Sequence, residues 1–412
     1  MKTNPPLLSA FVALLLALAL SPFSARGDSV DAWGYNVYGQ LGDGSTTNRL
    51  SPVSVASLSS GDTAIAGGLY HSVAIQNGAV YAWGRNQFGQ LGDNTTTTRL
   101  SPVAVTGLSS GVTAIAGGAF YSLAIKSGAV YGWGYNFYGN LGDGTSIERH
   151  SPVAISSLTS GVTAIAAGGY HSLAIQNGAV YAWGYNGFGQ VGDGTSTDSH
   201  SPVAIAGLTS GVTAIAGGAD HSLAIQNGAV YAWGYNFYGE LGDGTTTDRH
   251  SPVAITSLTS GVTAIAGGYY HSLAIQNGAV YAWGLNSYGE LGDGTTNDSI
   301  YPVQVPGLSN IVQVTANDYS SYALATDGSL WVWGRNISGE LGLGDTTNRL
   351  TPTHLQAPAG YLFTSIEGEA NGSHVLATLT VAPEPASLAL LALAATPLLT
   401  RRRKSFPAAL RC

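Results

Sequence analysis

The stretch "HSLAIQNGAVYAWG" occupies residues 171–184 and recurs unchanged at residues 221–234 and 271–284. A Trp-Gly pair recurs around it with a period of 50 residues, and the tryptophans of these pairs are Trp33, Trp83, Trp133, Trp183, Trp233, Trp283 and Trp333. Repeats with a fixed period of roughly 20–50 residues are typical of solenoids, propellers and related arrays. The sequence therefore predicts one supersecondary unit used seven times, in which the unchanged residues, the tryptophans above all, are structural.

Each unit is predicted to contain four short strands. A segment such as "VTAIAGG" leads to "HSLAIQ", an Asn-Gly pair, "AVYAWG", a polar loop and finally "SPVAI". These runs are rich in Val, Ile, Ala, Tyr and Trp and show no helical period, which favours strands. Asn-Gly is typical of a type I′ hairpin turn, whose two central residues need positive φ. It occurs, or is replaced by Ser-Gly or Asp-Gly, at residues 77–78, 127–128, 177–178, 227–228, 277–278 and 327–328. The pattern predicts an all-β fold, a seven-bladed β-propeller of four-stranded antiparallel blades.

The two ends of the repeat region complement each other. Residues 29–34, "SVDAWG", read as the third strand of a unit that lacks its first two strands. Residues 363–380, "FTSIEGEANGSHVLATLT", read as a first and a second strand without a third. We therefore expect a propeller over residues 28–380, closed by two N-terminal strands that pair with two C-terminal strands. Such closure removes the open sheet edges that promote aggregation.

The repeat resembles a known family. Residues 228–255, "GAVYAWGYNFYGELGDGTTTDRHSPVAI", followed by "VTAIAGGYYHSLAI" at 262–275, are similar to the repeat of the regulator of chromosome condensation family. The resemblance extends over residues 29–380 and implies a seven-bladed propeller. Some members of the family are guanine-nucleotide exchange factors of a small GTPase, so the resemblance implies exchange activity as one possible function. A β-lactamase inhibitor protein is also built from such repeats, so the resemblance implies a secreted inhibitor as another.

Both termini are predicted to be targeting segments. Residues 1–27 contain Lys2, an apolar run at 7–20 and a plausible cleavage point after Ala25 or Gly27, which indicates a secretory signal peptide. Residues 381–404 resemble the PEP-CTERM sorting signal of Gram-negative bacteria, and residues 405–412 form a tail. The residues that carry this motif are Pro383, Glu384, Pro385, Arg401, Arg402 and Arg403. The resemblance implies processing by an exosortase-type enzyme and delivery to the cell envelope or extracellular matrix, with transient or single-span membrane association as the two alternatives for the C-terminus.

Charge and composition exclude several classes of function. Residues 28–382 keep 8 of the 15 Lys and Arg residues but 22 of the 23 Asp and Glu residues, a net charge of −14, which argues against a nucleic-acid partner. Cys412 is the only cysteine, so neither an intrachain disulfide nor a cysteine metal site is expected. The glycine-rich stretch "GYNFYGELGDG" lacks the lysine and the following helix of a phosphate loop. No catalytic triad or isolated carboxylate pair stands out, so we expect neither a cofactor nor enzymatic activity.

Two repeated polar positions admit a structural or a metal-binding role. One holds His71, His171, His221, His271 and His374, with Tyr121 and Ser321 expected in its place in the other blades. These histidines are predicted to bond to backbone in the strand or the adjoining turn, as buried polar groups usually do. The other holds Asp43, Asp143, Asp193, Asp243 and Asp293 in a "GDG" motif. An Asx-type turn is the favoured interpretation of the aspartates, and calcium is the alternative.

If the repeated residues are scaffold, the variable residues are candidates for a binding site. The Ala- and Gly-rich "VTAIAGG" segment suits the crowded centre of a propeller, so the two variable residues after it are expected at the mouth of the central channel, with a longer "EANG" at 369–372. The long loop after each Trp-Gly should share that face, while the Asn-Gly turns lie on the opposite one. The predicted partner-binding residues are Tyr70, Phe120, Tyr170, Asp220, Tyr269, Tyr270, Tyr319, Tyr138 and Tyr238.

Tyrosine combines contact area with a polar tip and suits protein or glycan recognition. The favoured hypothesis is an exported, envelope-associated, non-catalytic scaffold that binds a protein or an extracellular polysaccharide through this face. The alternatives are a secreted protein inhibitor, a guanine-nucleotide exchange factor and a polysaccharide-active enzyme, the last of which lacks an identifiable acid–base pair.

Overall fold

A computed structural model of the chain describes residues 29–58 and 61–383. The predicted signal peptide at 1–27 lies outside the described residues, and so do Glu384, Pro385, Arg401, Arg402 and Arg403 of the predicted sorting signal. Within the described residues all regular structure is β. These residues contain no helix long and apolar enough to cross a membrane.

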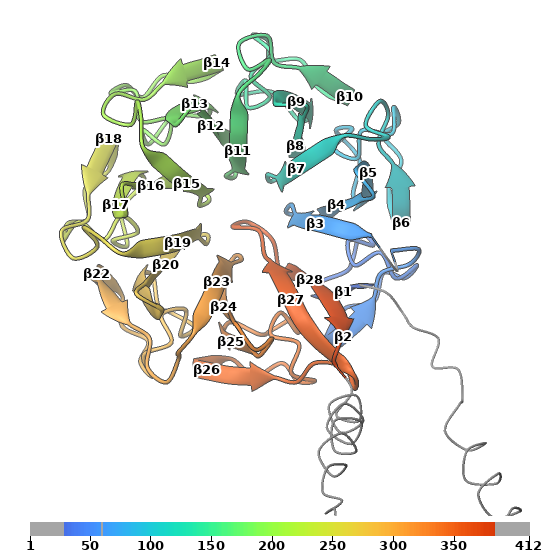
Figure 1. The fold of residues 1–412 in the computed structure, drawn as a ribbon, viewed down its shortest axis with the longest axis vertical. Coiled ribbons are helices and arrows are strands. Elements are labelled where there is room, and N and C mark those ends of the chain that lie inside the picture. Colours follow the sequence, from blue (N-terminus) through green and yellow to red (C-terminus); the bar gives the residue numbers. More distant parts are fainter. Residues whose placement is uncertain (1–28, 59–60, 384–412) are drawn as a thin grey trace, which may run out of the picture.

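The described chain forms seven four-stranded antiparallel sheets arranged as blades around a central axis (Figure 1). The blade that closes the ring contains β1 (Ser29–Gly34), β2 (Arg49–Ser54), β27 (Tyr361–Glu367) and β28 (His374–Val381). The next two blades contain β3 (Asp62–Gly67), β4 (His71–Gln76), β5 (Ala79–Gly84) and β6 (Arg99–Ala104), then β7 (Val112–Gly117), β8 (Tyr121–Lys126), β9 (Ala129–Gly134) and β10 (Arg149–Ala154). Two more contain β11 (Val162–Ala167), β12 (His171–Gln176), β13 (Ala179–Gly184) and β14 (Ser199–Ala204), then β15 (Val212–Gly217), β16 (His221–Gln226), β17 (Ala229–Gly234) and β18 (Arg249–Ala254). The last two contain β19 (Val262–Gly267), β20 (His271–Gln276), β21 (Ala279–Gly284) and β22 (Ser299–Gln304), then β23 (Ile311–Ala316), β24 (Ser320–Ala325), β25 (Leu330–Gly334) and β26 (Arg349–Leu355).

Ring closure follows the prediction. The closing blade has the strand order β2-β1-β28-β27, so two strands from each end of the propeller build one sheet. β1 and β28 pair antiparallel along their length, from Ser29 opposite Leu379 to Gly34 opposite His374. The strand β28 therefore lies between β1 and β27 and joins the first described residues to the last ones.

The hairpin turns explain the regular register of most blades. Asn177 and Gly178 have φ values of 52° and 80°, the two positive angles that a type I′ turn requires. The turn between β24 and β25 differs from the predicted one, because its chain runs through Thr326, Asp327 and Gly328 and only Gly328 has positive φ, 84°. A three-residue loop of this kind, closed by the bond from Ala325 N to Ser329 O at 2.9 Å, shifts β24 by one residue relative to the other blades.

The shift corrects one expectation. Ser320 lies opposite Gly334 as His271 lies opposite Gly284, so Ser320, and not Ser321, takes the histidine position in this blade. The two residues before β24 that face the channel mouth are therefore Asp318 and Tyr319.

The core lies between neighbouring blades. The tryptophans of the Trp-Gly pairs, Trp33, Trp83, Trp133, Trp183, Trp233, Trp283 and Trp333, are completely buried. Trp83, for example, packs against Val30, Leu41 and Val55 of the preceding blade. Its indole Nε1 also donates a hydrogen bond to the Gln40 carbonyl oxygen at 2.8 Å. Burying a side chain of this size contributes about 3 kcal/mol, so the repeated tryptophan supplies much of the cohesion between blades.

The faces of the propeller differ in their loops. The innermost strands β3, β7, β11, β15, β19, β23 and β27 surround the axis (Figure 1). Because strands alternate in direction, the short loops after these strands share a face with the long loops that follow each Trp-Gly pair. The hairpin turns lie on the opposite face. β1 begins and β28 ends at the hairpin-turn face, since Gly34 and His374 are at the other ends of these strands.

Candidate binding face

A band of aromatic rings covers the face formed by the long loops. We call the residue just before each second strand of a blade a rim residue, and the seven rim residues are Tyr70, Phe120, Tyr170, Asp220, Tyr270, Tyr319 and Ser373. Rings of neighbouring rim residues are close together: the centroids of Tyr70 and Phe120 are 6.2 Å apart, and those of Phe120 and Tyr170 are 6.4 Å apart. The structure thus brings most of the predicted binding residues together in one band, which we call the aromatic face.

Rings from the long loops pack behind the rim residues. Tyr38 contacts Tyr70 at a centroid distance of 4.9 Å, Tyr138 contacts Tyr170 at 5.5 Å and Tyr238 contacts Tyr270 at 5.1 Å. Tyr269 lies 4.4 Å from Tyr270 and stacks with Tyr319 at 5.8 Å. These rings are half-buried, so each serves both as packing for its neighbours and as accessible surface.

The most exposed rings of the aromatic face are two phenylalanines that were not among the predicted site residues. Phe137 and Phe237 are 65% and 63% exposed, each at the tip of a long loop. Each packs edge-on against the tyrosine that follows it, with Phe137 and Tyr138 centroids 5.1 Å apart and Phe237 and Tyr238 centroids 5.0 Å apart. The sequence feature that could have identified them is the variability of this position, which holds Val37, Gln87, Gly187, Ser287 and Ile337 in the other units. Such free exchange is typical of a position without a packing role.

Two rim residues, Ser373 and Asp220, are not aromatic, and their surroundings differ. At Ser373 the gap is filled by Arg335, whose guanidinium lies 4.9 Å from the Tyr319 ring centroid. Its Nη2 pairs with Asp318 Oδ2 at 2.9 Å and donates a hydrogen bond to Ser373 Oγ at 2.8 Å. Arg335 also pairs with Glu340 Oε1 at 3.2 Å. Arg335 is therefore held by two carboxylates and one ring face.

At Asp220 the described residues supply no such cation. Asp220 Oδ1 accepts a hydrogen bond from Gln190 Nε2 at 3.1 Å, and no ion pair joins the Asp220 carboxylate to a cation of the described residues. Burial raises the pKa of Asp220 to about 6, and the bond from Gln190 opposes this shift. A carboxylate among aromatic rings, with a raised pKa and one neutral partner, has remaining capacity for a cationic ligand.

The repeated histidines are structural, but their bonds differ from the prediction. His71, His171, His221, His271 and His374 are buried, and each Nε2 lies 2.8–2.9 Å from a serine Oγ of the next blade. Ser122, the partner of His71, donates its own proton to the Gln90 carbonyl oxygen at 3.0 Å. His71 Nε2 must then be the donor to Ser122, so each histidine joins two blades through a side chain and does not bond to its own strand. Burial lowers the pKa of His71 to about 3, which keeps the ring neutral.

The aspartates of the "GDG" motifs stabilise the long loops. Asp43 Oδ1 accepts hydrogen bonds from Ser45 N at 2.9 Å and Ser45 Oγ at 2.8 Å, which confirms the predicted Asx-type turn. Asp43 Oδ2 pairs with Arg49. Asp93, Asp143 and Asp243 repeat this pairing with the arginine of their own blade. Asp193 and Asp293 do not, because Ser199 and Ser299 replace that arginine. Within residues 29–58 and 61–383, no three His, Cys, Asp or Glu side chains come together as a metal site.

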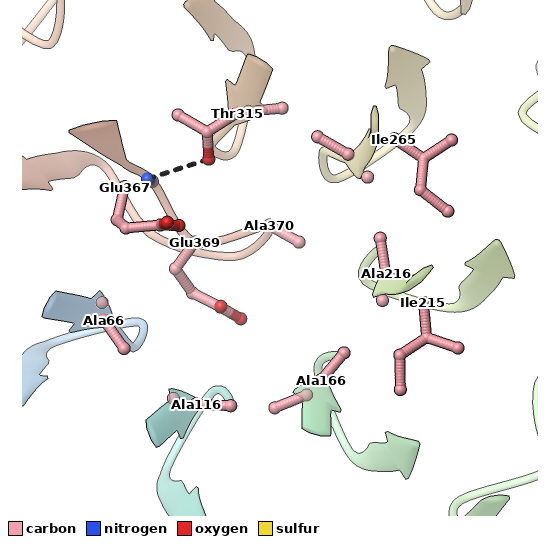
Figure 2. A pocket seen from close by; sticks show the side chains of 18 of the residues that line it. Ala66, Ala116, Ala166, Ile215, Ala216, Ile265, Thr315, Glu367, Glu369 and Ala370 are labelled. Carbon is pink, nitrogen blue, oxygen red and sulfur yellow. Dashed lines mark hydrogen bonds between the residues drawn. The ribbon is translucent and has the colours of Figure 1, made fainter. Parts of the chain in front are cut away.

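The central channel is a cavity of about 420 Å³ lined mainly by Ala, Gly and Ile of the innermost strands. Figure 2 shows Glu367, at the end of β27, and Glu369, in the loop after it, both of which line this space. Burial raises the pKa of Glu367 to about 8 and raises the pKa of Glu369 well above its usual range. The predicted "EANG" loop extends across the mouth of the channel. Asn371 of this loop lies next to Gly169 of another blade, where a Cβ atom added to Gly169 would lie 3.2 Å from Asn371 Oδ1. The "EANG" loop thus narrows the mouth of the channel beneath the aromatic face.

Comparison with known sequences identifies a family over almost the whole described region. The sequence profile of the RCC1-like domain matches residues 152–380. The profile of the regulator of chromosome condensation (RCC1) repeat matches residues 29–75, 77–125 and 127–175. Among curated protein sequences, no significant match to the chain is found.

Solved structures share the fold. Human WBSCR16 is similar with a TM-score of 0.76 and 23% sequence identity, covering 86% of this chain and 100% of that one. Yeast RCC1 (Prp20), in its crystal structure bound to Kap60, has a TM-score of 0.76 and 21% identity, covering 89% of this chain and 92% of that one. Prp20p from Saccharomyces cerevisiae, described with its binding to Gsp1p and histones, has a TM-score of 0.76 and 20% identity, covering 90% and 95%. At these identities the similarity concerns the fold.

Proposed function

Since the chain belongs to the family of RCC1-like propellers, we propose that it is a non-catalytic scaffold that binds a protein partner through its aromatic face. The observation that carries the proposal is the band of half-buried tyrosines topped by the exposed rings of Phe137 and Phe237. Aromatic side chains are enriched at protein interfaces because they bury a large area at low entropic cost. A polysaccharide that stacks on the same rings is the alternative ligand.

The family supports a binding role. Yeast Prp20p is described with binding to Gsp1p and histones, and yeast RCC1 with Kap60. No catalytic constellation is needed for such a role. The buried histidines and the paired aspartates of this chain are each engaged in holding blades or loops together.

The proposed place of action is the envelope or extracellular matrix of a Gram-negative bacterium, with an exosortase-type enzyme as processing partner. This part of the proposal rests on residues 1–27 and 381–404 of the sequence. Fractionation of expressing cells, with mass spectrometry of both termini, tests it: recovery of the full-length chain from the cytoplasm contradicts it.

The binding role is tested by removing the two exposed rings. The double variant Phe137→Ser and Phe237→Ser should reduce binding to a partner from envelope extract by at least roughly tenfold, since loss of an interface aromatic commonly costs more than about 1 kcal/mol. Its melting temperature should match that of the parent, because other units carry small or polar residues at the same position. Binding is measured by pull-down and then by titration of the recovered partner, with a glycan array run in parallel.

The control lies on the opposite face. Val312 is 54% exposed at the hairpin-turn end of β23, where other blades carry threonine, so Val312→Thr removes an exposed apolar side chain far from the aromatic face. It should leave binding unchanged. Binding that survives in the double phenylalanine variant but is lost in Val312→Thr contradicts the proposal, and recovery of glycans alone favours the polysaccharide alternative.

A further inference from the structure

We propose that Asp220 and the tyrosines around it form a receptor for an arginine side chain of the partner protein. The proposal rests on the binding role of the aromatic face and specifies which chemical group is bound there. Four features of the described residues support it.

The first feature is the replacement of a ring by a carboxylate within the aromatic face. Asp220 takes the rim position that Tyr170 and Tyr270 hold in the blades on either side. The Asp220 side chain is shorter than the tyrosine side chains at the equivalent positions on either side. It therefore places a carboxylate where the flanking blades place a ring.

The second feature is the series of aromatic rings around Asp220. The ring contacts run from Tyr170 to Tyr270 through the long loops behind Asp220, with centroid distances between 4.8 and 6.1 Å. The intermediate rings are those of Tyr138, Tyr185, Phe188 and Tyr235. Burial is the main cause that raises the pKa of Tyr185 and Tyr269, and the Asp220 carboxylate adds to it in both. These tyrosines therefore stay neutral and offer π faces beside a negative charge.

The third feature is that the same molecule already binds guanidinium groups in this way. Arg335 combines an ion pair to Asp318 at 2.9 Å with a position 4.9 Å above the Tyr319 ring, in the gap left by Ser373. Arg85 lies 4.7 Å from the Tyr38 centroid and 5.4 Å from that of Tyr70. A cation over an aromatic face is attracted by the ring quadrupole, and the attraction grows when water is excluded.

The fourth feature is the unmet charge of Asp220. The two arginines of the aromatic face, Arg85 and Arg335, belong to other blades, and no ion pair of the described residues includes Asp220. The Asp220 position thus has a carboxylate and neighbouring rings, as the Arg335 site does, but no cation from the described residues. Arginine suits this position better than lysine, because its planar guanidinium stacks on rings and bonds a carboxylate at the same time.

The experiment compares two capped tripeptides, Gly-Arg-Gly and Gly-citrulline-Gly, which have nearly the same shape but differ in charge. Each is titrated into the full chain, and the tyrosine ring signals are followed by NMR. The arginine peptide should bind saturably, with a dissociation constant roughly tenfold lower than that of the citrulline peptide, because a charge-assisted hydrogen bond is lost in the latter. Absence of saturable binding, or equal binding of the two peptides, overturns the proposal.

Two variants locate the effect. Asp220→Asn keeps the shape and the bond from Gln190, yet it should weaken arginine-peptide binding roughly tenfold. Asp220→Tyr restores the ring of the flanking blades and should abolish the preference for arginine over citrulline. The matched control is Asp298→Asn, because Asn48 and Asn348 accept the equivalent loop hydrogen bond in other blades, as Asp298 does from Asn286 N at 2.8 Å. Equal binding by Asp220→Asn and Asp298→Asn overturns the proposal.

The outcome for the inference is separable from that for the binding role. If the variant with serines at positions 137 and 237 loses the natural partner while Asp220→Asn binds it as the parent does, the aromatic face is an interface but Asp220 is not its arginine receptor. If Asp220→Asn loses both the arginine peptide and the natural partner, both proposals are supported.

Discussion

Glu240 and Glu290 occupy a long-loop position that is glutamine in three other blades. One carboxylate oxygen of each accepts a backbone hydrogen bond, from Tyr238 N at 3.0 Å and from Tyr288 N at 2.8 Å. The other oxygen, Oε1, is buried and has no hydrogen-bond partner among the described residues. Gln40 makes the same bond to Tyr38 N through its amide oxygen at 3.0 Å. Glu240 and Glu290 thus accept the same backbone hydrogen bond as Gln40, in an environment that disfavours a negative charge.

This environment makes stability depend on pH. Burial raises the pKa of Glu240 to about 8 and that of Glu290 to about 7. A carboxyl group with a raised folded-state pKa contributes its full stability below about pH 4.5 and loses it as the pH rises through the folded value. The double variant Glu240→Gln and Glu290→Gln should therefore be more stable than the parent at pH 8, by on the order of 1–3 kcal/mol.

At pH 5, where both glutamates are protonated in the folded chain, the difference should nearly vanish. Urea unfolding at the two pH values measures both quantities. Equal stabilisation at pH 5 and pH 8 would show that charge on these two side chains is not the cause. Glu340 serves as the contrasting case, because Arg335 pairs with it at 3.2 Å, so Glu340→Gln should not stabilise the protein at pH 8.

At the scale of single elements, the two-residue hairpins were predictable and the one exception was not. Asn-Gly requires positive φ at both residues, and Asn227 and Gly228 have values of 52° and 81°. The Asp-Gly pair at 327–328 looks equivalent in sequence, yet the loop is one residue longer and β24 is shifted. Counting from the fixed tryptophan period hides such a shift. β23 is shifted together with β24, and the extra residue in the turn is offset by one residue fewer in the loop from β22 to β23, 305–310, than in the equivalent loop 255–261.

The hairpin geometry can be tested at one turn. Asn227→Val places a β-branched residue at φ 52° and should destabilise the protein by about 1–2 kcal/mol, the usual cost of the left-handed region for such residues. Asn227→Gly, which keeps the conformation without a side chain, should change stability by far less. Thermal unfolding followed by circular dichroism compares the two variants, and equal losses would contradict a type I′ turn at this position.

The aromatic face was predictable in its location but not in its pairings. Alternation of strand direction placed the rim and the long loops together, and the variable aromatic residues marked them. That Arg335 fills the gap beside Tyr319, while Asp220 has no such partner, depends on contacts between blades that lie far apart in the sequence. Identical repeats contain no signal for contacts of this kind, since the contacts arise from the few residues in which the repeats differ.

For the whole molecule, stability depends on a closed ring. Adjacent blades are joined by buried tryptophans, by histidine–serine bonds and by backbone bonds between rim loops, such as Ala119 N to Gly169 O at 3.1 Å and Tyr269 N to Asp318 O at 3.1 Å. His374 of β28 makes the bond to Ser72 at 2.8 Å that joins the closing blade to its neighbour. Loss of β28 therefore removes both the centre of one sheet and one joint of the ring.

Truncation tests this dependence. A chain that ends at Ser373 lacks β28, so it should lose the cooperative unfolding transition and expose β1 and β27 as unpaired edges. A chain that ends at Pro383 retains all 28 strands of the described residues and should unfold as the full-length protein does. Unfolding by urea with tryptophan fluorescence compares them, and a cooperative transition of similar midpoint in both would show that ring closure contributes little.

The pairing of β1 with β28 also determines which face of the propeller points away from a surface to which either end is attached. Both Ser29 and Val381 lie at the hairpin-turn face, on the side away from the aromatic rings. A tether, an affinity tag or a solid support joined at either end would hold the molecule by its hairpin-turn face. The aromatic face would then point outward, so immobilised and free protein should capture ligands equally well.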